Sequence, residues 1–322
     1  MMKMFTATVL GMMVIGSVQA GPLNKADIAS DARWIVHFDW EKYRTTELHQ
    51  MITATPEHAK AAARIAVASA MLGFNPLEDI DSVTAYGTGY NQGNGAMIIR
   101  GLLDPRKATA MLEMNETHAS QPYGARTIHT WKANRGGHDR EGSCAFYDDG
   151  TVILGKAAAT VKAAIDVLDM KAPSLKANRD GIVVPEVSPD VFMMVYADQF
   201  DGKGVQNPKA QFFKNAVSLT LAAAETDGIM VIEAEMGAEA ADKAVLINNA
   251  LTGMLSFAML GAADDPAMAG MVNAFKINTD GQIVKLSFRQ DAETFMEFVR
   301  QRMEKRHQRR PPRLEKQVPA DQ

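Results

Sequence analysis

The sequence predicts an α+β protein built from two related modules, each an antiparallel sheet with helices packed on one face. Residues 147–156 show a strand, a tight turn at Asp149 and Gly150, and a second strand, and an alanine-rich helical run follows. The same order of strand, Asp-Gly turn, strand and helix returns over residues 274–303. A layout that is used twice indicates an internal duplication.

The first twenty residues have the pattern of a secretory signal peptide. Lys3 supplies a positive start, residues 5–15 are mostly apolar, and Ala20 ends a small-x-small cleavage pattern. We therefore expect cleavage near Ala20 and export to the periplasm of a bacterium or to the outside of the cell. We find no later stretch that is long and apolar enough to cross a bilayer, so we expect no transmembrane span.

The first module is expected over residues 21–170. Thr55 and Pro56 predict a helix start, because a hydroxyl caps the helix and proline fits its first turn, and Gly73 predicts the helix end. Asp104 and the proline after it open a second helix in the same way. Apolar β-rich runs predict strands at 34–39, 82–89, 96–103 and 126–132, and the glycine-rich, polar stretch 133–142 is expected to be a loop.

The second module is expected over residues 190–303, after a proline-containing linker at 171–189. Its elements follow the same order, with a strand at 191–197, a hairpin at 216–235, a long helix at 239–260 and a closing hairpin and helix. Beyond it, residues 304–322 are rich in Lys and Arg and have no apolar periodicity. We expect this basic tail to be disordered.

Three phrases carry a resemblance to a known family. They lie at residues 73–79 before a strand, at 102–108 at the opening of a helix, and at 149–155 before the last helix of the first module. On these phrases the chain resembles a family of exported bacterial proteins of unknown function. The resemblance implies a duplicated α+β fold and no established activity, and it carries over no functional residue.

Most catalytic and cofactor-binding patterns are absent from the sequence. The glycine-rich stretch 87–93 runs into a predicted strand, whereas a dinucleotide fingerprint opens a helix. No histidine pair has zinc-site spacing, and the single cysteine, Cys144, is expected to be buried and inert. We therefore assign no catalytic, cofactor-binding or metal-ligating residue and expect no cofactor.

One dispersed site stays open as a hypothesis. His37 and Asp39 share a strand face, and His129 lies on another strand, so the three could form a site if those strands pair. The alternative is that these histidines are half-buried or surface residues without a chemical role. His138 is expected in an exposed loop that could contact a ligand.

Charge and methionine content suggest what the chain binds. Acidic residues outnumber basic ones before residue 300, which argues against nucleic acid as a partner. The tail from Arg300 holds eight Lys and Arg residues and could contact the cell envelope. Four methionines gather near the end of the long predicted helix, at Met254, Met259, Met268 and Met271, where they either fill the core or bind an apolar molecule.

These observations favour a non-enzymatic exported protein with a structural or binding role in the cell envelope. A carrier of an apolar ligand, such as a lipid, is the second possibility and rests on the methionine-rich region. An enzyme with dispersed carboxylate and histidine residues is the third. The identity of any partner cannot be read from these residues.

Overall fold

The computed structural model describes residues 23–90, 93–135, 138–177, 184, 188–199 and 214–308. The expected signal peptide and the chain beyond residue 308 lie outside the described residues, as does most of the linker. The elements are η1 (Lys25–Asp27), β1 (Trp34–Asp39), α1 (Trp40–Arg44), α2 (Glu47–Thr53), α3 (Pro56–Leu72), β2 (Ile80–Gly87), β3 (Gly95–Gly101), α4 (Pro105–Glu113), β4 (Ala119–Tyr123), β5 (Arg126–Arg135), β6 (His138–Asp148), β7 (Thr151–Gly155), α5 (Ala158–Leu168), β8 (Val191–Asp198), β9 (Ala216–Thr226), β10 (Ile229–Ala238), α6 (Ala241–Leu260), α7 (Pro266–Asn273), β11 (Phe275–Asp280), β12 (Ile283–Asp291) and α8 (Ala292–Gln308).

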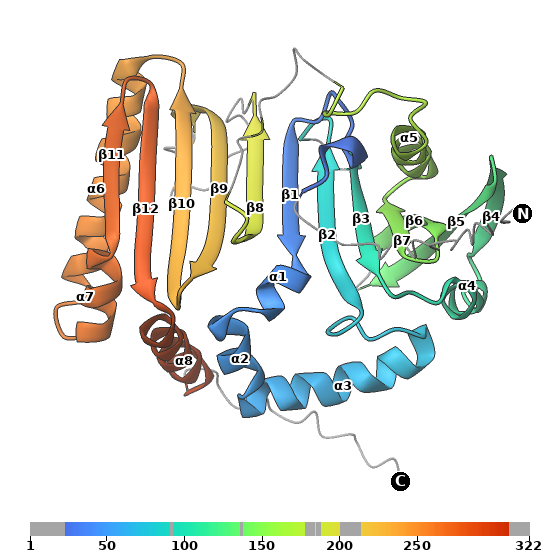
Figure 1. Cartoon of the computed structure of the whole chain (residues 1–322), viewed down its shortest axis with the longest axis horizontal. Coiled ribbons are helices and arrows are strands. Elements are labelled where there is room, and N and C mark those ends of the chain that lie inside the picture. The colour runs from blue at the N-terminus through green and yellow to red at the C-terminus, as the bar shows by residue number, and fades with distance from the viewer. Residues whose placement is uncertain are drawn as a thin grey trace, which may run out of the picture.

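The α+β class is confirmed. In the described part of the chain, twelve antiparallel strands form one sheet in the order β11-β12-β10-β9-β8-β1-β2-β3-β7-β6-β5-β4 (Figure 1). The sheet is continuous because β1 and β8 pair with each other, from Trp34 opposite Ala197 to Phe38 opposite Met193. The sequence predicted a sheet in each half and did not predict this joint.

The two halves of the sheet have the same strand order. Read outward from the joint, the first half runs β1-β2-β3-β7-β6 and the second runs β8-β9-β10-β12-β11. The first half adds the hairpin strands β5 and β4 at its outer edge and three helices between β1 and β2. This shared order is what two copies of one module would give.

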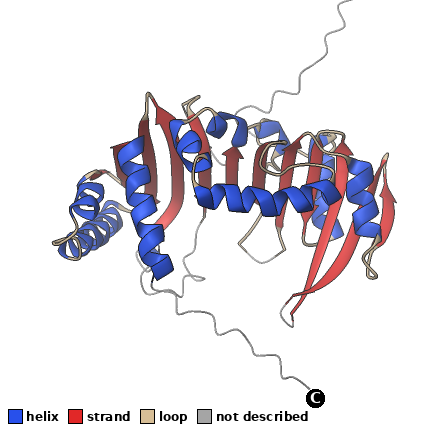
Figure 2. Cartoon of the chain, turned by 90° about the horizontal axis from the view of Figure 1, so that it is seen from below, coloured by secondary structure: helices blue, strands red, loops and turns tan. Residues whose placement is uncertain are grey.

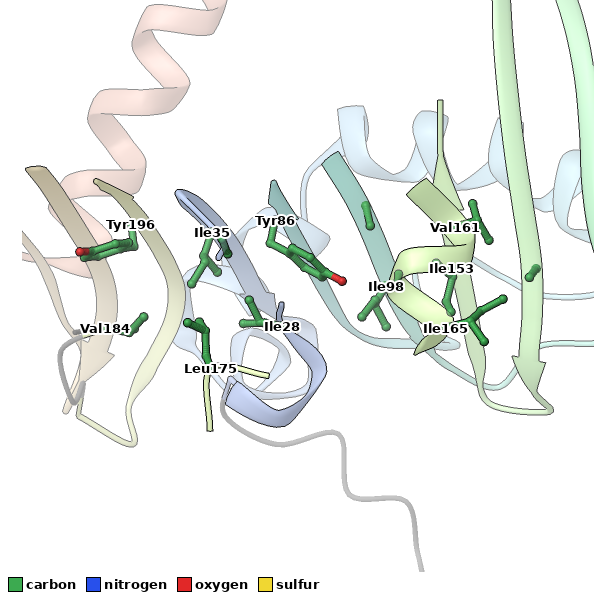
Figure 3. Close-up of a cluster of buried hydrophobic side chains, with 14 of the residues drawn as sticks. Ile28, Ile35, Tyr86, Ile98, Ile153, Val161, Ile165, Leu175, Val184 and Tyr196 are labelled. Atoms are coloured by element: carbon green, nitrogen blue, oxygen red, sulfur yellow. The ribbon is translucent and has the colours of Figure 1, made fainter. Parts of the chain in front are cut away.

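Helices α5 and α6 cover opposite faces of the sheet. Helix α5 packs on the face that holds Ile35, because Val161 and Ile165 lie in one buried cluster with Ile98 and Ile153 (Figure 3). Helix α6 packs on the other face. Its Ile247 clusters with Met236. Met236 lies in one cross-strand row with Leu219, Ala197 and Trp34, and Trp34 faces the side opposite to its strand neighbour Ile35.

The helix starts predicted from the sequence are present. The Thr55 hydroxyl accepts a hydrogen bond from the His58 backbone N–H, Pro56 occupies the first turn of α3, and Gly73 ends the helix with a φ of 78°. The Asp104 carboxylate caps α4 through the backbone N–H groups of the next turn. Each cap satisfies backbone groups that the helix itself leaves unpaired.

Helix α3 is held mainly at its two ends. It contacts α2 at one end and α4 at the other, and crosses beneath the strands between them (Figure 2). None of its described side chains is buried, and Val67 is 69% exposed.

The expected loop at residues 133–142 was wrong. Strand β5 extends to Arg135 and β6 begins at His138, so most of this stretch forms a long hairpin. The glycines of this stretch predict a loop, but Gly142 is required by packing. A Cβ atom there would lie 2.5 Å from the Trp131 ring.

We expect Ile35→Ala to destabilise the protein strongly, because Ile35 is fully buried at the joint between the halves. The free energy of unfolding should fall by about 2–5 kcal/mol, measured by urea denaturation. The control is Val36→Ala, since Val36 is 39% exposed on the opposite face. It should cost at most about 1 kcal/mol. Equal losses for the two variants would contradict this account of the joint.

Candidate functional site

The structure does not bring His37, Asp39 and His129 together. Four strands, β2, β3, β7 and β6, separate β1 from β5 in the sheet. The cross-strand register also places His129 in one row with Cys144, Leu154, Met97, Ala85 and Val36, so it faces the side opposite to His37. The dispersed site hypothesis was therefore wrong, because strand pairing could not be derived from the sequence.

His37 is buried in the joint and has one polar partner. Its Nδ1 lies 2.9 Å from the Thr84 hydroxyl, and its Nε2 has no hydrogen-bond partner within the described residues. Burial lowers the pKa of His37 below its ordinary value of 6.5, and the nearby Asp39 carboxylate opposes this shift only in part. The imidazole is therefore neutral at pH 7. It is also too deeply buried, at 5% exposure, to meet a substrate.

Protonation of His37 should destabilise the fold at acid pH. Because the pKa is lower in the folded state, the unfolded chain takes up the proton first as the pH falls below about 6.5. Stability contributed by the neutral ring is thus present above that pH and is lost as the pH falls toward the folded-state pKa. We expect His37→Gln to flatten the loss of stability between pH 7 and 5, measured as the urea midpoint. An unchanged slope would contradict this.

His129 pairs with His118, a partner that the sequence analysis missed. The two rings stack, and Nε2 of His118 lies 3.0 Å from Nδ1 of His129. Burial and then the neighbouring His118 lower the pKa of His129. Cys144 is opposite His129 on β6. Nevertheless, no group of three or more His, Cys, Asp or Glu side chains among the described residues could hold a metal ion.

Cys144 is buried, as expected. Burial raises the pKa of its thiol to about 12, so the reactive thiolate is scarce at neutral pH. His138 begins β6 and does not lie in the expected loop.

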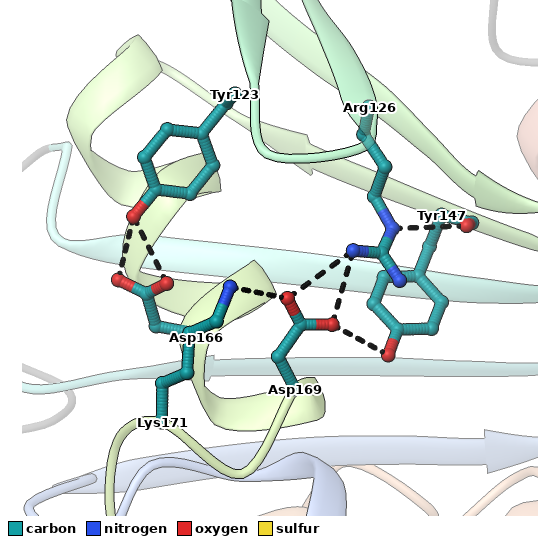
Figure 4. A network of polar contacts seen from close by, with 6 residues as sticks. All are labelled: Tyr123, Arg126, Tyr147, Asp166, Asp169 and Lys171. Carbon is teal, nitrogen blue, oxygen red and sulfur yellow. Dashed lines mark hydrogen bonds and ion pairs between the residues drawn. The ribbon is translucent and has the colours of Figure 1, made fainter.

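A polar network joins the end of α5 to the β5–β6 hairpin (Figure 4). The Tyr123 hydroxyl donates to both oxygens of the Asp166 carboxylate, at 2.9 and 2.8 Å. Asp169 accepts hydrogen bonds from Arg126, Tyr147 and Lys171. Lys171, Tyr147 and Arg126 together hold the pKa of Asp169 below its ordinary value, although partial burial opposes them. Both carboxylates are hydrogen-bonded within the fold, so the network holds α5 in place.

The glycines of the 87–95 stretch serve packing. A Cβ atom on Gly87 or Gly95 would lie 2.5 or 2.8 Å from the Trp34 indole ring. The Trp34 Nε1–H also donates to the Gly89 carbonyl oxygen at 3.0 Å. These contacts account for Gly87 and Gly95, and Gly93 has a φ of 103°, which favours glycine in the turn.

Helix α6 is the element with the most unusual surface. Its inner side packs on the sheet through Ala244, Ile247 and Leu251. Two of its polar side chains, Asn248 and Thr252, are engaged with the helix itself and with the edge strand. Asn248 donates to the Thr279 hydroxyl at 2.6 Å, and the Thr252 hydroxyl donates to Asn248 at 3.1 Å.

The outer side of α6 exposes several large apolar side chains beside the polar Asn249 and Ser256. Phe257 is 79% exposed and Leu260 is 77% exposed, and about half of the side chain is exposed at Val245, Leu246 and Met254. No charged residue lies between Lys243 and Asp264. Exposed apolar patches of this kind typically mark a surface that contacts a partner. We define the α6 outer face as these five side chains together with Gly253.

One expectation about this helix was wrong. Helix α6 is long and apolar enough to cross a membrane, by length and composition alone, and only 17% of the qualifying window is buried. The sequence was expected to hold no stretch after residue 20 that meets this criterion. The methionine cluster divides in the structure, because Met271 is buried in the core whereas Met254 lies on the outer face.

Comparisons with known proteins give no family. No protein-family model matches the chain, and no curated protein matches it. Among solved structures, there is a distant similarity to TP0453, a Treponema pallidum protein. Its crystal form III gives a TM-score of 0.46 at 9% identity, covering 87% of this chain and 99% of that chain. Crystal form I gives 0.45 at 10% identity, covering 87% and 97%.

Proposed function

We propose that the protein is a non-enzymatic binding protein that acts outside the cytoplasm, and that the α6 outer face is its binding surface. The exposed apolar side chains on this face carry the proposal. Burying an exposed side chain as large as Phe or Leu contributes about 1.5–3 kcal/mol, so a partner that covers Phe257 and Leu260 gains much of its affinity from these two. The signal-peptide pattern supports the location.

The residues that could support catalysis do not favour an enzyme. His37 is buried, the carboxylates of the α5 network are satisfied within the fold, and the Cys144 thiol is inert. An apolar ligand carrier remains the second candidate, because Met254 and its exposed neighbours would suit an acyl chain. On either reading, the same face of α6 becomes covered.

Hydroxyl-radical footprinting tests this proposal without knowledge of the partner. Met254 is expected to be oxidised several-fold more slowly in the cell envelope than in dilute purified protein, because a bound partner excludes the oxidant. Met170, which is 90% exposed at the end of α5, is the matched control and should be oxidised equally in both samples. Equal oxidation of Met254 in both samples would overturn the proposal.

A further inference from the structure

We propose that His118 and His129 form a binding site for one Cu²⁺ ion, in which the two imidazoles are neighbouring ligands and water fills the remaining positions. The site lies where β4 and β5 end the sheet, at the opposite end from α6 (Figure 1). It is therefore separate from the α6 outer face. Neutral imidazole is the commonest metal ligand in proteins, and Cu²⁺ has the highest affinity for such sites among the divalent ions of its row.

The distance between the two ring nitrogens fits a shared metal ion. Nε2 of His118 and Nδ1 of His129 lie 3.0 Å apart. With metal–nitrogen bonds of about 2.0–2.1 Å, two ligands at a right angle place their nitrogens about 2.9 Å apart, and two ligands at the tetrahedral angle place them about 3.3 Å apart. The observed distance is closer to the right angle. Neighbouring ligands of Cu²⁺ take this angle, whereas Zn²⁺ prefers the tetrahedral one.

Metal binding moves one proton and changes no charge on the rings. Without a metal, one of the two facing nitrogens carries a proton and donates it to the other in a hydrogen bond. Both facing nitrogens must be free of protons to bind an ion. Each neutral ring then carries its single proton on its other nitrogen. Exchange with water is sufficient for this change, so no proton is released overall.

The chain holds both rings in place before an ion binds. His129 lies within β5 and is only 6% exposed. The turn before β4 fixes His118, whose backbone N–H donates to the Asn115 carbonyl oxygen at 2.8 Å. The turn is tied to β5, because the Lys132 backbone N–H donates to the Thr117 hydroxyl at 2.7 Å. A ligand pair that is already positioned loses little conformational entropy upon binding.

The surroundings of the pair admit a cation. His118 is only partly buried, and Ser120, opposite His129 on β4, is exposed. The Glu113 carboxylate at the end of α4 acts on the His129 ring in the direction that favours positive charge. Within the described part of the chain no third His, Cys, Asp or Glu completes the pair, so we assign the remaining positions to water.

Titration of the full exported chain with CuCl2, with glycine as a weak competing ligand, tests this inference. We expect one Cu²⁺ to bind most tightly. His118→Ala should weaken that affinity by about 100-fold or more, because two linked ligands act through a high effective concentration. His58→Ala on α3 is the matched control, since His58 is also partly buried, and it should bind like the unchanged chain. Equal affinity of His118→Ala and the unchanged chain would overturn the inference.

Pulsed EPR of the copper-loaded chain tests the ligand set. Two imidazoles should couple to Cu²⁺ in the unchanged chain, and at most one in His118→Ala. Cys144 lies opposite His129 on β6, but Cys144→Ser should keep both the affinity and the signal of two imidazoles, because the buried thiol is not a ligand. A weaker affinity of Cys144→Ser would overturn the two-histidine ligand set.

Urea denaturation gives a second readout and shows whether the variants fold. Cu²⁺ should raise the urea midpoint of the unchanged chain, because it binds the folded state, and should leave that of His118→Ala where it is. If His118→Ala does not unfold cooperatively without copper, His118→Gln replaces it, since glutamine keeps a polar side chain and removes the imidazole. An equal rise of the midpoint in the unchanged chain and the variant would contradict binding at this pair.

Discussion

The pairing of β1 with β8 is the interaction on which the rest of the structure depends. It joins the two halves into one sheet through five residue pairs and lies at one end of a buried cluster that contains Ile35, Met194 and Tyr196. Hydrogen bonds beside the strands extend the joint. The Asp198 backbone N–H donates to the Arg33 carbonyl oxygen at 2.8 Å, and the Tyr90 hydroxyl donates to the Asp198 carbonyl oxygen at 2.6 Å. Without this joint each half would expose an unpaired strand.

The two halves also differ in the face of the sheet that their helices cover. A two-fold axis that relates two antiparallel paired strands leaves the faces of the sheet unchanged. Equivalent helices of the two halves would then cover the same face. Helix α5 covers one face in the first half, but α6 and α8 cover the other face in the second half. On the face that α5 covers, the second half instead carries the charged side chains of Glu233, Glu235 and Lys285. In the second half, the face on the α5 side of the sheet is charged and needs no helix to cover it. Helix α6 covers the opposite face and forms the outer layer there.

Local signals in the sequence were sufficient for much of the fold. Thr55-Pro56 and Asp104-Pro105 marked helix starts, and the structure has both. Helix α7 was missed, although Asp265-Pro266 carries the same signal and its carboxylate caps the helix. Strand β4 was also missed, since Pro122 and its polar neighbours resemble a loop. Capping depends on neighbours in sequence, whereas an edge strand is defined by the strand it pairs with.

The candidate site could not be predicted in the same way. An apolar helix in a sequence is equally compatible with a core position and with an exposed one, because periodicity does not say which sides have partners. His37 and His129 face opposite sides of the sheet because of the register in which six strands pair. No local pattern in the sequence encodes that register. Only the three-dimensional arrangement shows that Phe257 and Leu260 lie on the surface.

Both edges of the sheet are protected against pairing with a strand of another chain. An open sheet exposes unpaired backbone groups at both edges and can associate there with other chains. At the β4 edge, Pro122 lacks a backbone N–H and the strand is short. At the β11 edge, Lys276 and Asp280 are exposed and charged, which disfavours strand addition. Both edges therefore resist pairing by a further strand. In the proposed function, association therefore uses side-chain contacts on the α6 outer face rather than the backbone of the sheet.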